Sequence, residues 1–282
     1  MAVKFEKVVL KNDSKPISFT IEEGSIFGVY GNSGSNKTEI LETIACIEKP
    51  KSGIVKILKN DIVCKSSEKD LYECRKKVGY IYEDPNDQFF HDNVYDELVF
   101  SLKNFGFKEE TYDEKVKKVL AIVGLNESNL KRNPFSLSSG EAKKIALASV
   151  LIYNPKIIMI DDLTIGLDYL AKKEFVKIIR TLKKRFNKTI ILSSKDVDFL
   201  HSVVDKVIVV SNKAVLLEGT KYNVLGQEKF LNEVGLEVPK LLNFANLVKN
   251  KKGINLGYRD DINDLMKDVY RNVKWYCDRK IC

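Results

Sequence analysis

No stretch of the sequence reaches the run of about 18 apolar residues that a membrane-spanning helix requires. The first segment, Met1-Ala-Val-Lys-Phe-Glu-Lys, carries an acidic side chain too early for a secretory signal peptide. We therefore expect no bilayer-spanning segment and a chain that stays in the compartment where it is made.

Groups that bind metals or form disulfides are few. The sequence has two histidines, and its cysteines show no CxxC spacing. A zinc site is therefore not expected, and the thiols are expected to be reduced, as in a cytosol. The five cysteines are Cys46, Cys64, Cys74, Cys277 and Cys282.

Clusters of arginine are also absent, although the formal net charge is +8. A basic chain can bind nucleic acid or an anionic membrane surface. The lysines are scattered among asparagine and isoleucine, whereas phosphate and base recognition favours clustered arginine. We interpret the lysines as mostly solvated faces and predict no nucleic-acid partner.

What is present is enough apolar sequence for an α/β core, since 44% of the 282 residues are hydrophobic. Alternating polar and apolar residues near the start predict antiparallel strands around Val8 and from Ile17 to Ile21. Apolar runs of strand length, each opened by one polar residue, follow and alternate with helical patterns, which predicts a parallel sheet covered by helices. These runs lie at residues 25–30, 156–160, 189–192 and 206–210.

Two regions show helical patterns without strands. Residues 88 to 152 predict an inserted helical subdomain, with apolar helix faces at 95–105 and 114–123. Residues 228 to 282 predict a helical C-terminal extension. The remaining sequence within residues 1–227 is expected to form one α/β domain with an antiparallel β subdomain at its N-terminus.

A phosphate-binding loop is predicted between the strand that ends at Tyr30 and the helical pattern that follows. The segment resembles a Walker A loop, in which backbone N–H groups and a helix N-terminus hold phosphates. Lys37 is expected to neutralise phosphate charge, and the Thr38 hydroxyl to bind Mg²⁺. The alternative for this segment is an ordinary Ser/Asn/Gly turn, but even considered alone its pattern favours nucleotide binding. It comprises Gly31, Asn32, Ser33, Gly34, Ser35, Asn36, Lys37 and Thr38.

Asn36 stands where the Walker A pattern has a glycine just before the lysine. Asparagine is the non-glycine residue that best tolerates a positive φ. We therefore expect the loop to keep its conformation at some cost in strain.

A second motif lies just before the helical pattern at 142–148. Its residues are Leu137, Ser138, Ser139, Gly140 and Glu141, and they resemble the signature sequence of ABC ATPases. Ser139 and Glu141 replace the Gly and Gln that are usual there. In that family the signature loop faces the γ-phosphate held by a partner subunit, so the resemblance implies a dimer.

Two further elements follow in the order and spacing of the ABC ATPase family. The apolar run that ends in Asp161 resembles a Walker B strand, whose carboxylate orders Mg²⁺ and its water. Asp162 stands where the family has the glutamate that polarises the attacking water. Asp168 matches the D-loop at the dimer interface. The resemblance implies a P-loop NTPase fold that binds ATP and Mg²⁺.

Two other positions depart from the family pattern. Glu83 replaces the glutamine that approaches Mg²⁺ and senses the membrane subunit, and Lys195 replaces the switch histidine. The two changes add one negative and one positive charge. We predict that Glu83 or Asp162 pairs with Lys195 in the nucleotide-free state; the alternative is that these positions simply tolerate change.

These departures should slow hydrolysis more than they weaken binding. The aspartate at 162 places its carboxylate about 1.5 Å short of a glutamate's, and a misplacement of about 1 Å can cost 10²-fold in rate. An ammonium at 195 only donates hydrogen bonds, whereas imidazole can also accept them. We expect a homodimer, if one forms, to turn over ATP poorly.

The stretches 84–106 and 227–239 resemble energy-coupling factor ATPases, which drive uptake of vitamins and metal ions. The resemblance implies a peripheral subunit on the cytoplasmic face of the membrane. It also implies three partners: a second ATPase, a transmembrane coupling subunit, and through that subunit a substrate-binding membrane protein. The C-terminal extension would help to pair the ATPases, and the helical subdomain would receive coupling helices.

Other members of the superfamily fit less well. A DNA-repair ATPase would carry a long coiled coil between the Walker A loop and the signature, and a translation-type protein would carry two ATPase cores. A nucleotide-binding scaffold or regulatory subunit that does not hydrolyse ATP remains open as an alternative.

Overall fold

A computed structural model describes residues 1–11 and 14–279, with side chains described as far as residue 272. Its core is a six-stranded sheet in the order β10-β9-β3-β8-β7-β6. Neighbouring strands are parallel except for β10, which is antiparallel to β9. The strands are β3 (Ile26–Tyr30), β6 (Val78–Ile81), β7 (Ile157–Ile160), β8 (Thr189–Ser194), β9 (Lys206–Ser211) and β10 (Ala214–Thr220).

A four-stranded antiparallel sheet in the order β2-β1-β4-β5 packs against this core. The stacked rings of Phe5 and Phe19, with centroids 4.4 Å apart, continue to Phe27 of β3, whose ring lies 5.8 Å from that of Phe19. One apolar cluster therefore joins the two sheets. The strands are β1 (Val3–Val9), β2 (Ile17–Ile21), β4 (Ser52–Ile57) and β5 (Asn60–Ile62).

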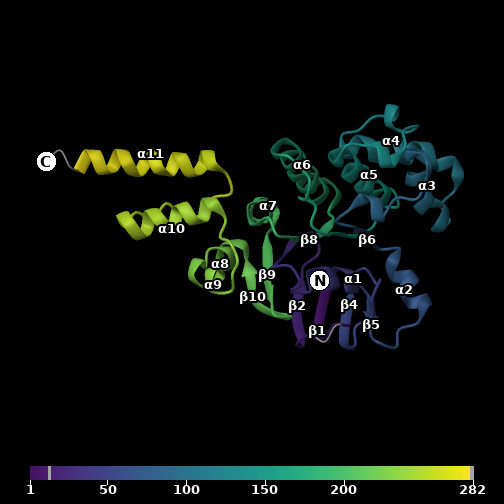
Figure 1. The fold of residues 1–282 in the computed structure, drawn as a ribbon, viewed down its shortest axis with the longest axis horizontal. Coiled ribbons are helices and arrows are strands. Elements are labelled where there is room, and N and C mark those ends of the chain that lie inside the picture. Colours follow the sequence, from purple (N-terminus) through teal and green to yellow (C-terminus); the bar gives the residue numbers. More distant parts are fainter. Residues whose placement is uncertain (12–13, 280–282) are drawn as a thin grey trace.

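Helices cover the parallel sheet because its strands are apolar on both faces. Figure 1 shows α3, α4 and α5 gathered at the end of the molecule away from the C-terminal helices. The helices of the first 203 residues are α1 (Lys37–Ile44), α2 (Glu68–Arg75), α3 (Val94–Asn104), α4 (Tyr112–Val123), α5 (Ser139–Leu151), α6 (Tyr169–Phe186) and α7 (Val197–Val203). Short 3-10 turns are η1 (Pro85–Asp87), η2 (Glu109–Thr111), η3 (Glu127–Asn129) and η4 (Pro134–Ser136).

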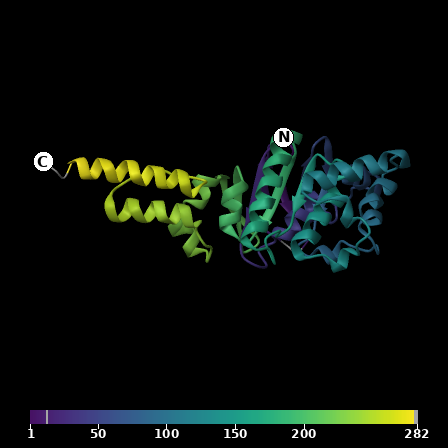
Figure 2. The same ribbon diagram turned by 90° about the horizontal axis from the view of Figure 1, so that it is seen from above.

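The chain ends in the helices α8 (Lys221–Leu225), α9 (Glu228–Glu233), α10 (Lys240–Lys252) and α11 (Ile262–Arg279). In both views α10 and α11 lie side by side and project away from the sheets (Figures 1 and 2). Large apolar side chains on these two helices are exposed: Phe244, Leu247, Ile262, Met266 and Tyr270.

The predicted α/β fold class, with its N-terminal antiparallel sheet and its parallel core, is confirmed. No helix in the part of the chain that the structure describes is long and apolar enough to cross a bilayer. Cys46, Cys64 and Cys74 are free thiols. Cys277 lies beyond the last described side chain, and Cys282 lies outside the described residues.

Candidate nucleotide-binding site

The predicted phosphate loop leaves the carboxyl end of β3 and leads into α1. Position 31 has room only for glycine, because a Cβ there would lie 2.2 Å from the carbonyl oxygen of Val210. Asn36 adopts φ 73° and ψ 23° at the N-cap of α1, the left-handed conformation that asparagine tolerates. The loop therefore keeps its turn without the usual glycine.

Lys37 lies under the loop and is only 7% exposed. Its ammonium donates to the carbonyl oxygens of Gly31 at 2.7 Å and Asn32 at 2.8 Å. Burial lowers the pKa of Lys37; the carboxylate of Asp162 acts in the opposite direction, and the charge of Lys195 lowers the pKa further. The charges that act on Lys37 thus include the carboxylates of Asp161, Asp162 and Glu83 as well as the second ammonium, that of Lys195.

Asp161 follows β7, and both of its carboxylate oxygens accept hydrogen bonds. The Tyr80 hydroxyl donates to Oδ2 at 3.0 Å, and the Ser193 hydroxyl donates to Oδ1. Tyr80 comes from β6 and Ser193 from β8, the two strands that flank β7. The carboxylate is therefore held from both sides.

Asp162 is turned into the protein and is 2% exposed. Its Oδ1 accepts hydrogen bonds from the hydroxyls of Ser194 at 3.2 Å and Thr164 at 3.3 Å. Its backbone adopts φ 33°, in the left-handed region, where a non-glycine residue is strained. Its other oxygen, Oδ2, is buried and has no hydrogen-bond partner in the described part of the chain.

Three buried polar atoms around the loop have no hydrogen-bond partner among the residues that the structure describes: Ser35 Oγ, Asn36 Nδ2 and Asp162 Oδ2. Unpaired buried polar groups are costly, so a polar ligand that reaches them is favoured. A phosphate chain with a hydrated cation fits this donor and acceptor set, with the Thr38 hydroxyl and the Asp161 carboxylate as the groups that would hold Mg²⁺. Within the described residues, no group of three or more His, Cys, Asp or Glu could hold a metal ion.

The predicted signature loop forms the N-terminus of α5. Ser138 is the N-cap, and Glu141 completes a capping box with it. The Arg132 guanidinium donates to Glu141 Oε1 at 2.8 Å and, with the Ser138 hydrogen bonds, lowers the pKa of Glu141 to about 2. The carboxylate that replaces the usual amide is therefore charged, paired and fixed in place.

Comparison with known proteins gives a consistent result. A family model described as "ABC transporter" matches residues 14–165. The energy-coupling factor transporter ATP-binding protein EcfA2 of Enterococcus faecalis is 34% identical over 229 residues, which are 81% of this chain and 79% of that protein. EcfA3 of Oenococcus oeni is 31% identical over 94% of this chain and 92% of its own length.

A solved structure, cbiO1 from Clostridium perfringens, described as part of the ABC transporter complex cbiONQ, has a TM-score of 0.74 at 26% identity. The match covers 87% of this chain and 98% of that one. The chain belongs to the ABC transporter family, as an ATPase of the energy-coupling factor type. The predicted enzyme class, an ATP hydrolase coupled to transport, is confirmed at this level.

In this ABC ATPase the helix after the Walker A loop and the signature helix contribute their apolar side chains to different core clusters. The helix α1 packs against β4, β6 and β8, whereas α5 packs against α3, α4 and β6. The charges of Asp161, Asp162 and Lys195 all act on Lys37. The signature instead lies against the D-loop. Ser139 Oγ is so close to Gly166 that a Cβ added to this glycine would lie 3.0 Å from it.

The D-loop residue Asp168 has a local role in the fold. It is the N-cap of α6, and its carboxylate accepts from the backbone N–H of Ala171 at 2.7 Å. Beside it, Ile165, Tyr169 and Leu170 are exposed, the last two at 69% each. The apolar surface around the D-loop is therefore open to a partner.

The predicted pairing of Lys195 with Glu83 or Asp162 was wrong. Lys195 makes no ion pair within 4.0 Å among the residues that the structure describes. Asp162 is instead directed to Ser194 and Thr164. Glu83 is exposed, and the group that reaches its backbone is Lys143, whose buried ammonium donates to the carbonyl oxygen of Glu83 at 3.1 Å.

Three residues that contact the site were not predicted from sequence: Tyr80, Ser193 and Lys143. Tyr80 and Ser193 lie in strands where alternation alone does not distinguish a site residue from a core residue. Lys143 offered a signal, since it is a lysine within the apolar helical pattern that follows the signature. A charge in such a position has to find a partner.

Proposed function

We propose that the chain binds and hydrolyses ATP with Mg²⁺ to power an energy-coupling factor importer for vitamins or metal ions. The observation that carries this proposal is the buried ammonium of Lys37, held by carbonyl oxygens of its own loop beside three unpartnered polar atoms. The names of the relatives, energy-coupling factor transporter ATP-binding proteins, support the assignment.

In this proposal the loop from Gly31 to Thr38 holds the phosphates. Thr38 and Asp161 hold Mg²⁺, with Glu83 nearby in the position of the family's glutamine. The Asp162 carboxylate polarises the attacking water, and Lys195 attracts the γ-phosphate. Each of these roles uses a charge or hydroxyl suited to its target.

In this proposal the subunit hydrolyses ATP slowly at the site formed by its own Walker motifs. The Asp162 carboxylate is a methylene shorter than a glutamate, and its Oδ1 is engaged by the hydroxyls of Ser194 and Thr164. A base that is held away from the water loses rate without losing substrate affinity. The signature of this subunit, from Leu137 to Glu141, can still serve the site of a partner.

The partner in this proposal is a second ATPase subunit, the same chain or a related one. The exposed apolar residues beside Asp168 and those along α10 and α11 support pairing at two separate surfaces. The C-terminal extension from residue 228 onward is thereby a dimerisation region. Exposed apolar surface of this kind marks interaction sites.

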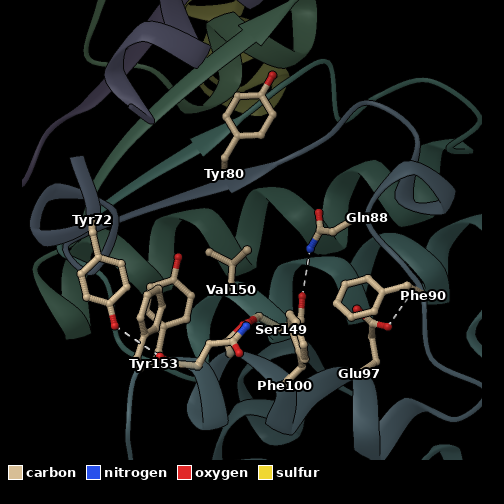
Figure 3. A pocket seen from close by; sticks show the side chains of 12 residues that line it. Tyr72, Tyr80, Gln88, Phe90, Glu97, Phe100, Ser149, Val150 and Tyr153 are labelled. Carbon is tan, nitrogen blue, oxygen red and sulfur yellow. Dashed lines mark hydrogen bonds between the residues drawn. The ribbon is translucent and has the colours of Figure 1, made fainter. Parts of the chain in front are cut away.

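A transmembrane coupling subunit docks at the groove between α2, α3 and α5, which has a volume of about 530 Å³. Figure 3 shows Tyr72, Phe100, Val150 and Tyr153 around this groove, while Tyr80 points away from them. The buried carboxylate of Glu97 fixes one rim by accepting from the backbone N–H of Phe90 at 3.0 Å. An aromatic-lined groove suits an amphipathic helix.

The test is affinity purification of the tagged chain from membranes, followed by identification of the proteins that accompany it. We expect a second ATPase, a transmembrane subunit and a substrate-binding membrane protein, which would place the chain at the cytoplasmic face of the membrane. Recovery of ribosomes or DNA in their place would refute the proposal.

The inward orientation of Asp162 favours one second candidate, a nucleotide-binding scaffold or regulatory subunit that does not hydrolyse ATP. The two functions differ in one measurable property of the assembled complex. If Lys37→Ala in this chain leaves the ATPase rate of the complex unchanged while abolishing ATP binding to the chain, the scaffold function is favoured.

A further inference from the structure

A segment of the C-terminal extension, Val234–Lys240, lies directly on the phosphate loop; we refer to it as the strap. Tyr30, the last residue of β3 before the loop, is almost fully buried. Its hydroxyl accepts from the backbone N–H of Glu237 at 3.0 Å and donates to the carbonyl oxygen of the same residue at 3.0 Å. One side chain thus pairs both backbone groups of a strap residue.

The loop itself also contacts the strap, through the residue two positions after Tyr30. The Asn32 side-chain amide donates to the carbonyl oxygen of Gly235 at 3.2 Å. The backbone carbonyl of Asn32 in turn accepts from the Lys37 ammonium at 2.8 Å. A single residue therefore connects the strap to the phosphate-binding lysine.

The strap also reaches the element that follows Lys195. The backbone N–H of Lys240 donates to Asp198 Oδ1 at 2.8 Å, and the Lys240 ammonium lies 3.4 Å from Asp198 Oδ2. Asp198 lies in the first turn of α7, three residues after the switch position at Lys195. Because Tyr30 and Ser194 are paired neighbours in β3 and β8, the strap joins the two loops that leave adjacent strands.

The strap is anchored in the core at both ends. Leu231 in α9, Leu236 in the strap and Leu242 in α10 are all buried in the main apolar cluster. The chain then continues into α10 and α11, whose exposed apolar residues were described above. The segment bonded to the phosphate loop is therefore continuous with both the core and the C-terminal helices.

We propose that Tyr30 and Asn32 are positioning residues through which the strap of the C-terminal extension holds the phosphate loop ready for nucleotide and so raises nucleotide affinity. This inference rests on the proposed function. The strap holds the loop in the conformation that receives phosphates. The entropy cost of ordering the loop is therefore not subtracted from the free energy of ATP binding. Asn36 increases the need for such support, since its positive φ strains the same loop.

The experiment compares the affinity of the purified full-length chain and its variants for a fluorescent ATP analogue in the presence of Mg²⁺. Tyr30→Phe and Asn32→Ala each remove a strap contact, and each should raise Kd about 3-fold to 10-fold, as expected for a lost hydrogen bond. The matched control is Tyr222→Phe. It also removes a tyrosine hydroxyl that fastens the extension, through Asp260, but it lies away from the loop. Its Kd should stay within about twofold of wild type.

A second readout separates positioning from simple loss of stability. Binding linkage is reciprocal, so ATP should slow amide hydrogen exchange at residues 234–240 in the wild type and do so less in Tyr30→Phe. Unchanged Kd in both strap variants, or an equal loss in Tyr222→Phe, would overturn the inference. Failure of the wild type to bind the analogue would instead overturn the proposed function, so the two failures are distinguishable.

Discussion

The Tyr80 hydroxyl donates a hydrogen bond to Asp161 Oδ2 at 3.0 Å, from the strand next to the one that Asp161 follows. With Ser193 on the opposite side, it fixes the carboxylate proposed to hold Mg²⁺. The position of that carboxylate is therefore set by two side chains outside the recognised motifs. A carboxylate held by its neighbours loses little conformational freedom when a cation binds.

Tyr80→Phe should weaken Mg²⁺ binding, so that nucleotide binding requires a higher Mg²⁺ concentration. The buried carboxylate oxygen loses its donor, and a change of about 1 kcal/mol corresponds to roughly a fivefold higher Mg²⁺ concentration at half effect. The measurement is a Mg²⁺ titration of the binding of the fluorescent ATP analogue. Tyr82→Phe is the control, because that ring is exposed and lies edge-on to Tyr80 at 4.7 Å. Equal curves for both variants would show that the hydroxyl does not position Asp161.

Lys143→Met should lower ATP turnover of the purified chain about tenfold or more while ATP affinity changes little. The Lys143 ammonium holds the Glu83 carbonyl and acts electrostatically on Asp162, so its loss disturbs the region where the water would be activated. Lys144→Met is a matched control, since Lys144 pairs with Glu174 at 2.6 Å on the outside of α5. Equal rates for the two variants would contradict a role for the buried ammonium.

Asp162→Glu should raise the turnover of the purified chain by about tenfold or more, because the added methylene extends the carboxylate toward the water. ATP affinity should stay within about twofold, since the phosphate loop is untouched. Glutamate tolerates the φ of 33° less well than aspartate, so a small loss of stability is also expected. Steady-state ATPase assays with a thermal unfolding control measure both effects. A rate that falls or stays level would show that the shorter side chain does not limit hydrolysis.

His201 should make the protein less stable in mild acid. Burial lowers its pKa to about 4, against a usual value near 6.5, with Lys221 acting in the same direction and Asp260, 3.8 Å away, opposing. The unfolded chain therefore binds more protons between these values. The stabilising effect is complete above about pH 6.5 and is lost as the pH falls towards 4.

The expected loss is about 2 kcal/mol between pH 7 and pH 5. It is measured as the difference between the wild type and His201→Phe in urea unfolding at the two pH values. An identical pH dependence for both proteins would mean that His201 is not the group responsible.

The motifs could be located from sequence because their chemistry depends on local order. A strand, a glycine-bearing loop and a helix in sequence are enough to predict the phosphate loop at Gly31 to Thr38. The conformation of Asn36 was likewise predictable, since few residues tolerate its φ. Periodicity also indicated the buried strands, because apolar runs on both faces are typical of parallel sheets.

Contacts between distant segments could not be predicted in this way. Nothing in the local sequence of Tyr30 indicates that its hydroxyl bonds to Glu237, which is 207 positions away. The partner of Lys195 was mispredicted for a similar reason, because charge balance says which groups can pair but not which way Asp162 points. Hydroxyls from Ser194 and Thr164 decided that orientation.

The central claim, that this subunit binds ATP through Lys37 but turns it over slowly at its own site, is tested most directly on the purified chain. Binding of the fluorescent ATP analogue and steady-state hydrolysis are measured for the wild type and for Lys37→Ala. We predict binding that is lost in Lys37→Ala, with turnover below about 1 per second, at the low end of enzyme rates. Fast turnover that Lys37→Ala abolishes, or no binding by the wild type, would contradict the account.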